Sequence, residues 1–262
     1  MEVKVQEVTV NLATGGVKVD KSQPPVLLVH GAGMDRTVWS QQTRYLAHHG
    51  FAPMAVDLPG HGRSEGELLS TISEMADWVA DLIHELDTGP VRLVGHSMGS
   101  LISLEVAARH TDAVERLILM GAAAAMPVHP ELLGAAERNE ILAPQLMTAW
   151  AHGTRAHVAG NPTPGLWMRS GCQALLERAA DGVIHNDLFA CNSYEAGDIA
   201  GRITCPVTVI VGSEDKMTPP KATAQLVAGF QEVDLRHLEG VGHMMMIEAP
   251  DRIREMMLSA LR

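Results

Sequence analysis

The stretch Val91-Arg-Leu-Val-Gly-His-Ser-Met-Gly-Ser100 places a serine between two glycines at the end of a short apolar run. The run before Gly95 is typical of a buried strand, and apolar positions after Ser97 recur at helical spacing. A strand that turns sharply into a helix exposes the hydroxyl at the turn, where it can act as a nucleophile. Glycines two residues before and after the serine fit such a turn, because neighbouring backbone leaves no space for a side chain. We therefore predict that Ser97 is a nucleophile.

A serine hydroxyl needs a base to remove its proton, and the base needs an acid to orient it. Among the 13 histidines, His243 stands in a Gly-flanked loop between a strand-like run and the final helix. Asp215 follows the apolar run 207–212, so it also lies after a strand. Loops at the carboxyl ends of parallel strands meet at one edge of the sheet. The sequence thus predicts Ser97, Asp215 and His243 as a catalytic triad, with Glu214 as a competing acid.

Four motifs of the chain resemble those of the α/β-hydrolase family. They are Leu28-Val-His-Gly-Ala-Gly33, Asp57-Leu-Pro-Gly-His-Gly-Arg-Ser64, Gly95 to Gly99, and Gly212-Ser-Glu-Asp-Lys-Met-Thr-Pro219 with Gly242-His243. The resemblance covers nearly the whole chain and points to the cap-bearing branch with a serine nucleophile, which includes esterases, lactonases and haloperoxidase-like members. It implies the chain order serine, aspartate, histidine. It also implies an oxyanion hole made by the backbone N–H groups of Ala32 and Met98.

Strand and helix signals alternate along the chain, as in a doubly wound α/β sheet. The runs that carry these signals are 26–30, 37–49, 52–56, 72–86, 116–120 and 207–212. At the N-terminus, residues 3–10 alternate with the period of a strand, and Gly15-Gly16 is expected to turn the chain back through Val17 and Val19. We therefore predict an α/β-hydrolase fold, a mostly parallel sheet with an N-terminal antiparallel hairpin at its edge.

The alternation stops between Ala123 and Asp198, where helical stretches occur without a convincing strand. We expect residues 123–198 to form a helical cap inserted into an α/β core made of residues 1–122 and 199–262. The two core strands on either side of the insertion should then be neighbours in the sheet.

Composition limits the partners and the location. The net charge of −11 argues against nucleic acid and anionic membrane, both of which require clustered cations. The three cysteines have no metal-binding spacing and leave one unpaired in any disulfide scheme, which suits a reducing compartment. The first residues lack the apolar core of a signal peptide. We predict a cytoplasmic protein that acts on a small molecule, with self-association left open.

Large apolar residues are frequent in the cap segment and directly after His243. They are Leu146, Met147, Trp150, Leu166, Trp167, Met168 and the run Met244-Met245-Met246. We predict that Trp150, Trp167, Met168 and Met244 line an adaptable pocket for an apolar acyl group, since methionine is flexible and polarisable. The alternative is that these residues pack the cap onto the core.

The motifs narrow the reaction. Dehalogenases and epoxide hydrolases that resemble this fold carry an aspartate where this chain has Ser97. Proline-type aminopeptidases carry Gly-Gly-Pro-Gly where this chain reads Gly31-Ala-Gly-Met34. The leading prediction is hydrolysis of a carboxylic ester, lactone or thioester through an acyl-enzyme, with no metal or organic cofactor. Two alternatives stay open, a carbon–carbon bond hydrolase of ring-cleavage products and a ligand receptor that retains the triad.

Overall fold

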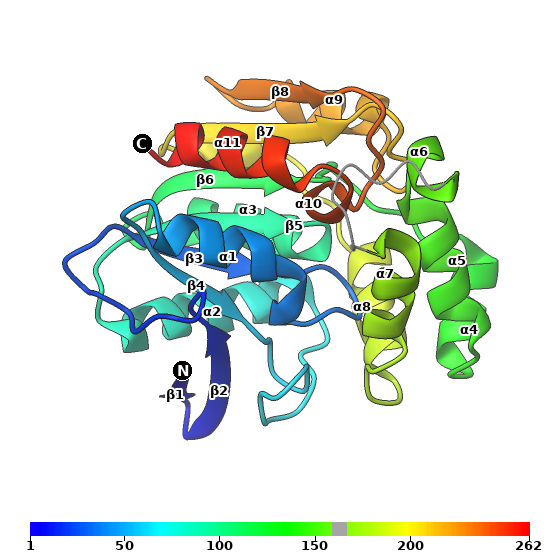
Figure 1. Ribbon diagram of the computed structural model, residues 1–262, viewed down its shortest axis with the longest axis horizontal. Helices are drawn as coiled ribbons and strands as arrows, with labels where there is room; N and C mark the ends of the chain where they lie inside the picture. Colours follow the sequence, from blue (N-terminus) through cyan, green and yellow to red (C-terminus); the bar gives the residue numbers. More distant parts are fainter. Residues whose placement is uncertain (159–166) are drawn as a thin grey trace.

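Eight strands form one sheet in residues 1–158 and 167–262, the part of the chain that this computed structural model describes (Figure 1). The strands are β1 (Glu2–Val5), β2 (Val8–Ala13), β3 (Pro25–Val29), β4 (Ala52–Val56), β5 (Val91–His96), β6 (Val114–Met120), β7 (Val207–Gly212) and β8 (Asp234–Leu238). Their spatial order is β1-β2-β4-β3-β5-β6-β7-β8. Strand β2 is antiparallel to β1 and to β4, and the other neighbours are parallel. The predicted doubly wound sheet is confirmed.

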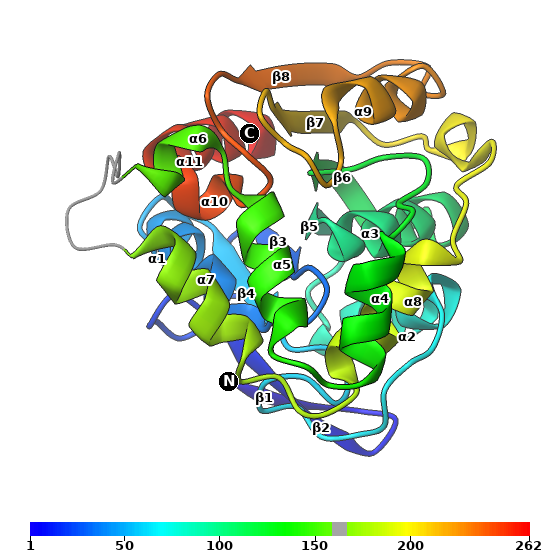
Figure 2. The ribbon, with the colours of Figure 1, turned by 90° about the vertical axis from the view of Figure 1, so that its right-hand side faces the viewer.

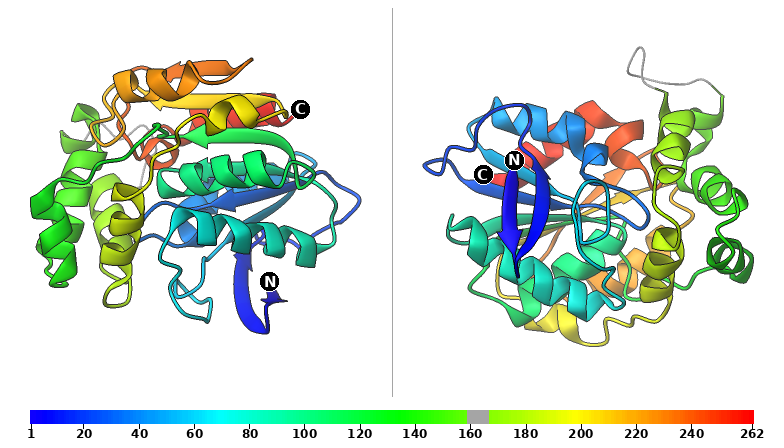
Figure 3. Two further views of the ribbon diagram at one scale, coloured as in Figure 1. Left: turned by 180° about the vertical axis from the view of Figure 1, so that it is seen from behind. Right: turned by 90° about the horizontal axis from the view of Figure 1, so that it is seen from below.

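Helices cover both faces of this sheet (Figures 1 and 3). Helices α1 (Ser40–Ala47) and α11 (Pro250–Leu261) lie on one face, and α2 (Ile72–Leu86), α3 (Met98–Arg109) and α9 (Pro220–Val227) lie on the other. Strands between two helical layers are buried on both sides, which explains why β3 and β4 are almost entirely apolar. None of the described helices combines the length and the apolar character needed to cross a bilayer.

Local signals fix several of these elements. Helix α2 begins at a capping box, in which Thr71 accepts from the Glu74 backbone and the Glu74 carboxylate accepts from Thr71. Strand β4 and helix α2 have the bounds that the sequence predicts. The helix expected over residues 37–49 is divided into a 3-10 turn, η1 (Arg36–Trp39), and α1. Asp35 caps this turn by accepting from the backbone of Thr37.

The N-terminal hairpin exists, but the prediction of its turn was wrong. Strands β1 and β2 pair with each other, and the chain reverses at Gln6 and Glu7, whose φ angles are 49° and 65°. Two successive residues with positive φ make the tight turn whose twist matches an antiparallel pair. Gly15 and Gly16 follow β2 and lead out of the sheet, and Val17 is exposed.

The helical insertion lies between β6 and β7. Its described elements are α4 (Pro130–Glu137), α5 (Leu142–Ala151), α6 (Thr154–His157), α7 (Met168–Leu176) and α8 (Val183–Asn192), and η2 (Ile199–Arg202) leads back to the core. These helices lie beyond the carboxyl ends of the parallel strands (Figures 1 and 2). Strands β6 and β7 pair directly, as predicted for strands that flank an insertion. We propose that residues 123–198 are the cap, and we call them the cap segment.

Candidate active site

Ser97 lies at the turn between β5 and α3. Its φ is 55° and its ψ is −120°, a conformation that a residue with a side chain rarely adopts. Its backbone N–H donates to the Met120 carbonyl oxygen at 2.9 Å, which ties the turn to the neighbouring strand β6. The buried strand and helix on either side hold this strained residue in place, and its side chain faces the space beyond the sheet.

The glycines around Ser97 are required by close backbone contacts. A Cβ atom on Gly95 would lie 2.1 Å from the Gly99 carbonyl oxygen, and a Cβ on Gly99 would lie 2.3 Å from the Val29 carbonyl oxygen. No side chain fits at either position unless the backbone moves. The two glycines therefore allow α3 to start against β3 and β5 directly after the serine.

Asp215 and His243 meet although 28 residues separate them. The His243 Nδ1 lies 2.8 Å from Asp215 Oδ2, and both side chains are buried. The second oxygen, Oδ1, accepts from the backbone N–H groups of Met217 and Thr218 at 2.9 and 2.8 Å. The Thr218 hydroxyl also donates to Oδ2 at 2.7 Å. The carboxylate is therefore fixed, and it holds the imidazole in one orientation.

The surroundings of Asp215 keep it ionised. Burial raises the pKa of this carboxyl, but the attraction of His243 and the hydrogen bonds from His243 and Thr218 outweigh burial and hold the pKa below its usual value. Glu214, the competing acid, points elsewhere: its Oε2 accepts from the backbone N–H of Thr154 in the cap segment at 2.6 Å. The geometry therefore favours Asp215 as the partner of the histidine.

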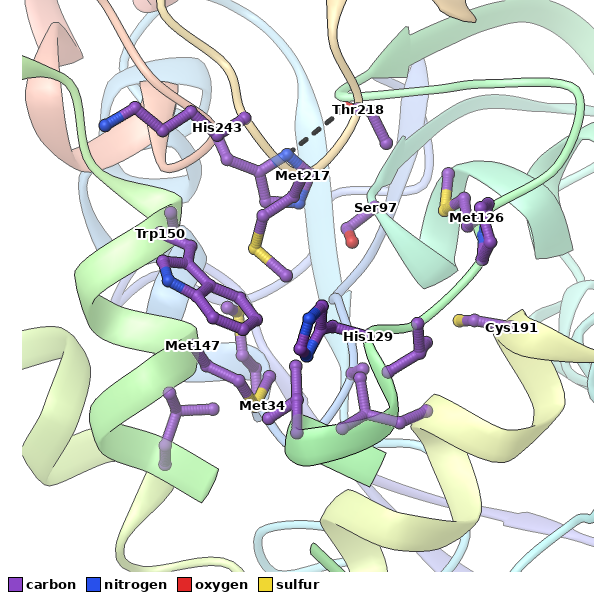
Figure 4. A pocket seen from close by; sticks show the side chains of 18 of the residues that line it. Met34, Ser97, Met126, His129, Met147, Trp150, Cys191, Met217, Thr218 and His243 are labelled. Carbon is purple, nitrogen blue, oxygen red and sulfur yellow. Dashed lines mark hydrogen bonds between the residues drawn. The ribbon is translucent and has the colours of Figure 1, made fainter. Parts of the chain in front are cut away.

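The other nitrogen of the imidazole faces the same cavity as the serine. Among the residues described, nothing forms a hydrogen bond to His243 Nε2, although the atom is buried. Ser97 and His243 both line one cavity and lie side by side in Figure 4. Catalytic hydrogen bonds in ligand-free structures are often long and shorten only when substrate binds. We therefore propose Nε2 as the atom that takes the serine proton.

His96 holds the backbone of the histidine loop. Its Nε2 lies 2.9 Å from the His243 carbonyl oxygen, and the two ring centroids are 4.7 Å apart. Burial, together with the neighbouring His243, lowers the pKa of His96 to about 3. The neutral ring donates its Nε2–H to the carbonyl and therefore positions His243 without competing for the proton.

Two backbone N–H groups are available beside Ser97. Ala32 lies in the loop after β3 and lines the cavity, and Met98 is the first residue of α3. In residues 1–158 and 167–262, neither N–H donates a hydrogen bond to another part of the chain. The N–H groups at a helix N-terminus have no partner within the helix. We therefore propose both groups as the donors of an oxyanion hole.

The cavity has a volume of about 380 Å³ and mostly apolar walls (Figure 4). Its polar groups are those of Ser97, His243 and Thr218, with His129 and Lys216 also on the lining. The apolar lining residues are Ala32, Met34, Met126, Pro127, Val128, Leu132, Met147, Trp150, Ala151, Cys172, Leu176, Leu188, Cys191 and Met217. Sulfur-containing side chains are frequent among them and adapt to ligands of different shape.

The structure corrects three of the four predicted pocket residues, because only Trp150 lines this cavity. Trp167 is 75% exposed and lies at a separate surface depression beside η1 and α1. Met168 is one helical turn before Cys172 on α7, so the helix carries it past the cavity to another depression. Met244 is fully buried and immediately precedes α10 (Met245–Glu248) in the chain. Leu166 lies outside the described residues.

Several lining residues were not predicted from the sequence. Met217 and Thr218 stand two and three residues after Asp215, so their position in the acid loop was a usable signal. Met34, Leu188 and Cys191 come from the loop after β3 and from α8, and no local pattern distinguishes them from packing residues. Within the described residues, no three His, Cys, Asp or Glu side chains are arranged to hold a metal ion.

Similar proteins agree with this architecture. The sequence model described as "Alpha/beta hydrolase family" matches residues 26–256. The (E)-2-((N-methylformamido)methylene)succinate hydrolase of Acinetobacter baylyi is 25% identical over 239 residues, 89% of this chain and 88% of that protein. A thermophilic esterase of solved structure is 25% identical, with a TM-score of 0.81 over 99% of this chain and 95% of its own.

The enol-lactonase of Burkholderia xenovorans LB400 has the same fold, with a TM-score of 0.87, 21% identity and coverage of 100% of this chain and 99% of its own. The family model covers most of the chain, and the mostly parallel eight-stranded sheet is the fold of that family. This chain therefore belongs to the alpha/beta hydrolase family.

Proposed function

We propose that the protein is a serine hydrolase that cleaves carboxylic esters through an acyl-enzyme. The observation that carries the proposal is the 2.8 Å contact between His243 Nδ1 and Asp215 Oδ2, with the free Nε2 in the same cavity as Ser97. A nucleophile, a base and an orienting acid in this arrangement perform acyl transfer. The similarity to an esterase at 25% identity supports an ester as substrate.

The chemistry follows from these positions. The Ser97 oxygen attacks the ester carbonyl carbon while His243 Nε2 takes its proton, and the carbonyl oxygen becomes an oxyanion held by the N–H groups of Ala32 and Met98. The imidazolium then returns the proton to the alcohol oxygen as the carbon–oxygen bond breaks. Water attacks the acyl-enzyme by the same route, which releases the acid and restores Ser97. Asp215 remains ionised and stabilises the imidazolium.

The cavity indicates which part of the ester enters. A chamber of about 380 Å³ with apolar walls favours an apolar acyl group over a charged one. Trp150 and Met147 of α5 and Leu188 of α8 supply large apolar surfaces from the cap segment. The cap segment therefore completes the pocket, and a small-molecule ester with an apolar acyl group is the proposed substrate class.

The test combines turnover with labelling. Wild-type protein and the Ser97→Ala variant are assayed on p-nitrophenyl esters of increasing acyl length and are treated with a fluorophosphonate. Ser103→Ala is the matched control, because it removes a buried hydroxyl of α3, six residues after Ser97. That hydroxyl has no hydrogen-bond partner among the described residues. We expect Ser97→Ala to lose turnover and labelling with an unchanged melting temperature, and Ser103→Ala to keep both.

The alternatives predict different results. Turnover of a ring-cleavage dienoate without ester turnover would replace the ester proposal with carbon–carbon bond hydrolysis. Saturable binding of esters without turnover in the wild-type protein would contradict enzymatic function and favour a receptor. A phosphonate adduct on any residue other than Ser97 would refute the mechanism.

A further inference from the structure

A buried ion pair connects the cap segment to the core. The His61 Nε2 lies 2.8 Å from Asp187 Oδ2, and both side chains are almost completely shielded from solvent. His61 belongs to the loop after β4 and Asp187 belongs to helix α8, 126 residues later. The proposed mechanism uses neither residue. A charged pair that is costly to bury therefore requires another explanation.

The hydrogen bonds of His61 require the charged form. Its Nδ1 lies 2.9 Å from the Pro59 carbonyl oxygen, and its Nε2 faces the Asp187 carboxylate. Both partners only accept hydrogen bonds, so both ring nitrogens must carry protons. Burial lowers the pKa of His61, but the Asp187 charge and the hydrogen bonds to Asp187 and Pro59 together outweigh burial and raise the pKa above its usual value. Burial raises the pKa of Asp187, but the His61 charge and the hydrogen bonds from His61 and Gly33 together outweigh burial and lower the pKa below its usual value.

Asp187 also reaches the loop that carries the proposed oxyanion donor. The backbone N–H of Gly33 donates to Asp187 Oδ2 at 2.8 Å. Gly33 has a φ of +68°, and a Cβ atom there would lie 2.8 Å from Cγ1 of Ile184, on the same helix as Asp187. Helix α8 thus packs directly against this loop and holds its backbone through one carboxylate oxygen.

The residue before Gly33 is Ala32, whose N–H is the proposed donor. The Ala32 N–H and the Gly31 carbonyl belong to the same peptide unit. The carbonyl oxygen accepts from His30 Nδ1 at 2.9 Å and from the Met34 N–H at 3.2 Å. Because a trans peptide is planar, fixing the carbonyl also fixes the direction of the N–H on its opposite side. The core therefore orients this peptide unit, and Asp187 holds the next one.

We propose that Asp187 and His61 are positioning residues for the Ala32 N–H, so that the oxyanion loop has its catalytic geometry only when α8 of the cap segment is docked. This inference rests on the proposed serine hydrolase function. Asp187 aligns the loop through Gly33, and protonated His61 holds the carboxylate in place. Substrate binding by the cap segment and stabilisation of the oxyanion are thereby coupled through one buried carboxylate.

Other charged and titratable groups face the pair. The ring centroids of His30 and His61 are 5.0 Å apart. Burial and the neighbouring His61 lower the pKa of His30 to about 4, so His30 stays neutral at neutral pH. Asp57 also raises the pKa of His61, and Arg36 pairs with Asp57. The Cys191 thiol near Asp187 has a raised pKa because of burial, so it is uncharged at neutral pH.

The pH range of the pair follows from these directions. His61 stabilises the folded state fully below the ordinary histidine pKa, and this stabilisation is lost as the pH rises through the raised pKa of His61. Asp187 stabilises the folded state fully above the ordinary aspartate pKa, and this stabilisation is lost as the pH falls through the lowered pKa of Asp187. The geometry of the oxyanion loop should therefore persist at neutral pH and weaken on the alkaline side as His61 loses its proton.

Three variants test the inference on a small acetate ester, with active sites counted by phosphonate titration. Asp187→Ala removes the acceptor for Gly33. Asp187→Asn keeps it, because an amide oxygen in the position of Oδ2 can accept from Gly33 and from a neutral His61 that carries its proton on Nε2. Arg178→Gln is the matched control, because Arg178 bonds Asp35 at 2.7 Å and so also joins the cap segment to this loop region without touching Gly33.

We expect Asp187→Ala to lower kcat about tenfold per titrated site with little change in KM, since loss of a whole oxyanion donor costs about 10²–10³. Asp187→Asn should keep kcat near the wild-type value at pH 7 and should lack the alkaline decrease of the wild-type protein. Arg178→Gln should match the wild-type protein in both respects. If Asp187→Ala does not fold, the pH profile of Asp187→Asn decides alone.

An unchanged kcat in folded Asp187→Ala, or the same alkaline decrease in Asp187→Asn and wild-type protein, would overturn the inference. These results are distinct from a failure of the proposed function, in which wild-type turnover would not depend on Ser97 at all.

Discussion

The carbonyl oxygen of Ala151, the last residue of helix α5, accepts a hydrogen bond from the backbone N–H of His243 at 2.8 Å. The Met244 N–H donates to the same oxygen at 3.0 Å. Glu248 reinforces the contact, because its carboxylate accepts from Gly153 at 2.9 Å and from Gly242 at 3.1 Å. The end of α5 and the loop of the proposed catalytic base thus form one hydrogen-bonded unit.

Asp215→Asn should lower kcat by about 10⁴, the loss that the same change causes in a serine protease triad. An asparagine amide that donates toward Nδ1 would favour the wrong tautomer and leave Nε2 protonated. Glu214→Gln is the control, because its side chain bonds Thr154 in the cap segment and not His243. Steady-state kinetics on one ester measure both. A loss at Glu214 equal to that at Asp215 would contradict the assignment of the acid.

Glu248→Ala should lower the free energy of unfolding by about 1–3 kcal/mol, because two buried backbone N–H groups lose their acceptor. Glu248→Gln should cost less, since one amide oxygen can replace Oε2, which accepts from both Gly153 and Gly242. Urea unfolding at pH 7 distinguishes them. Equal stability of Glu248→Ala and the wild-type protein would show that these hydrogen bonds contribute nothing.

The same carboxyl predicts a pH dependence of stability. Burial raises the pKa of Glu248, so the folded state favours the protonated form. Glu248 stabilises the folded state fully below the ordinary glutamate pKa, and this stabilisation is lost as the pH rises through the raised pKa. We therefore expect the wild-type protein to lose stability relative to Glu248→Gln as the pH rises from the ordinary glutamate pKa through the raised value. Unfolding at several pH values would reveal the opposite trend if the pKa were lowered.

Gly95→Ala should destabilise the protein by about 1–3 kcal/mol or more, because the new Cβ meets the Gly99 carbonyl oxygen. It should also lower the fraction of serine that reacts with a phosphonate, since the Ser97 turn must shift. Gly171→Ala on α7 is the control, because no atom lies within 4 Å of its added Cβ. Alanine there should be neutral or stabilising by up to about 1 kcal/mol. Similar losses in the two variants would refute the steric argument.

Trp150→Ala should change the preference among acyl chains, because Trp150 lines the cavity with Ser97. We expect kcat/KM for a longer acyl chain to fall about tenfold more than kcat/KM for acetate, the magnitude of a lost apolar pocket contact. Trp167→Ala is the matched control on a tryptophan that is 75% exposed and outside this cavity. A parallel loss for all esters in Trp150→Ala would make Trp150 a packing residue.

Local pattern was enough for most of the core. The bounds of β4 and α2 match the sequence prediction, because strand and helix periods and the capping box at Thr71 are properties of neighbouring residues. The hairpin was predicted but its turn was misplaced. Glycines at positions 15 and 16 were the stronger local signal, while Gln6 and Glu7 adopt positive φ because the paired strands enforce it.

By itself, the sequence determined the fold class and the candidates Ser97, Asp215 and His243, because each stands in a motif whose chemistry and strand context are local. Only the tertiary structure decided that Trp150 faces the cavity while Trp167 does not, and that Asp187 meets His61 and Gly33. Those contacts join helices of the cap segment to loops more than 100 residues away. They depend on how whole helices pack, and the spacing of neighbouring residues carries no information about that.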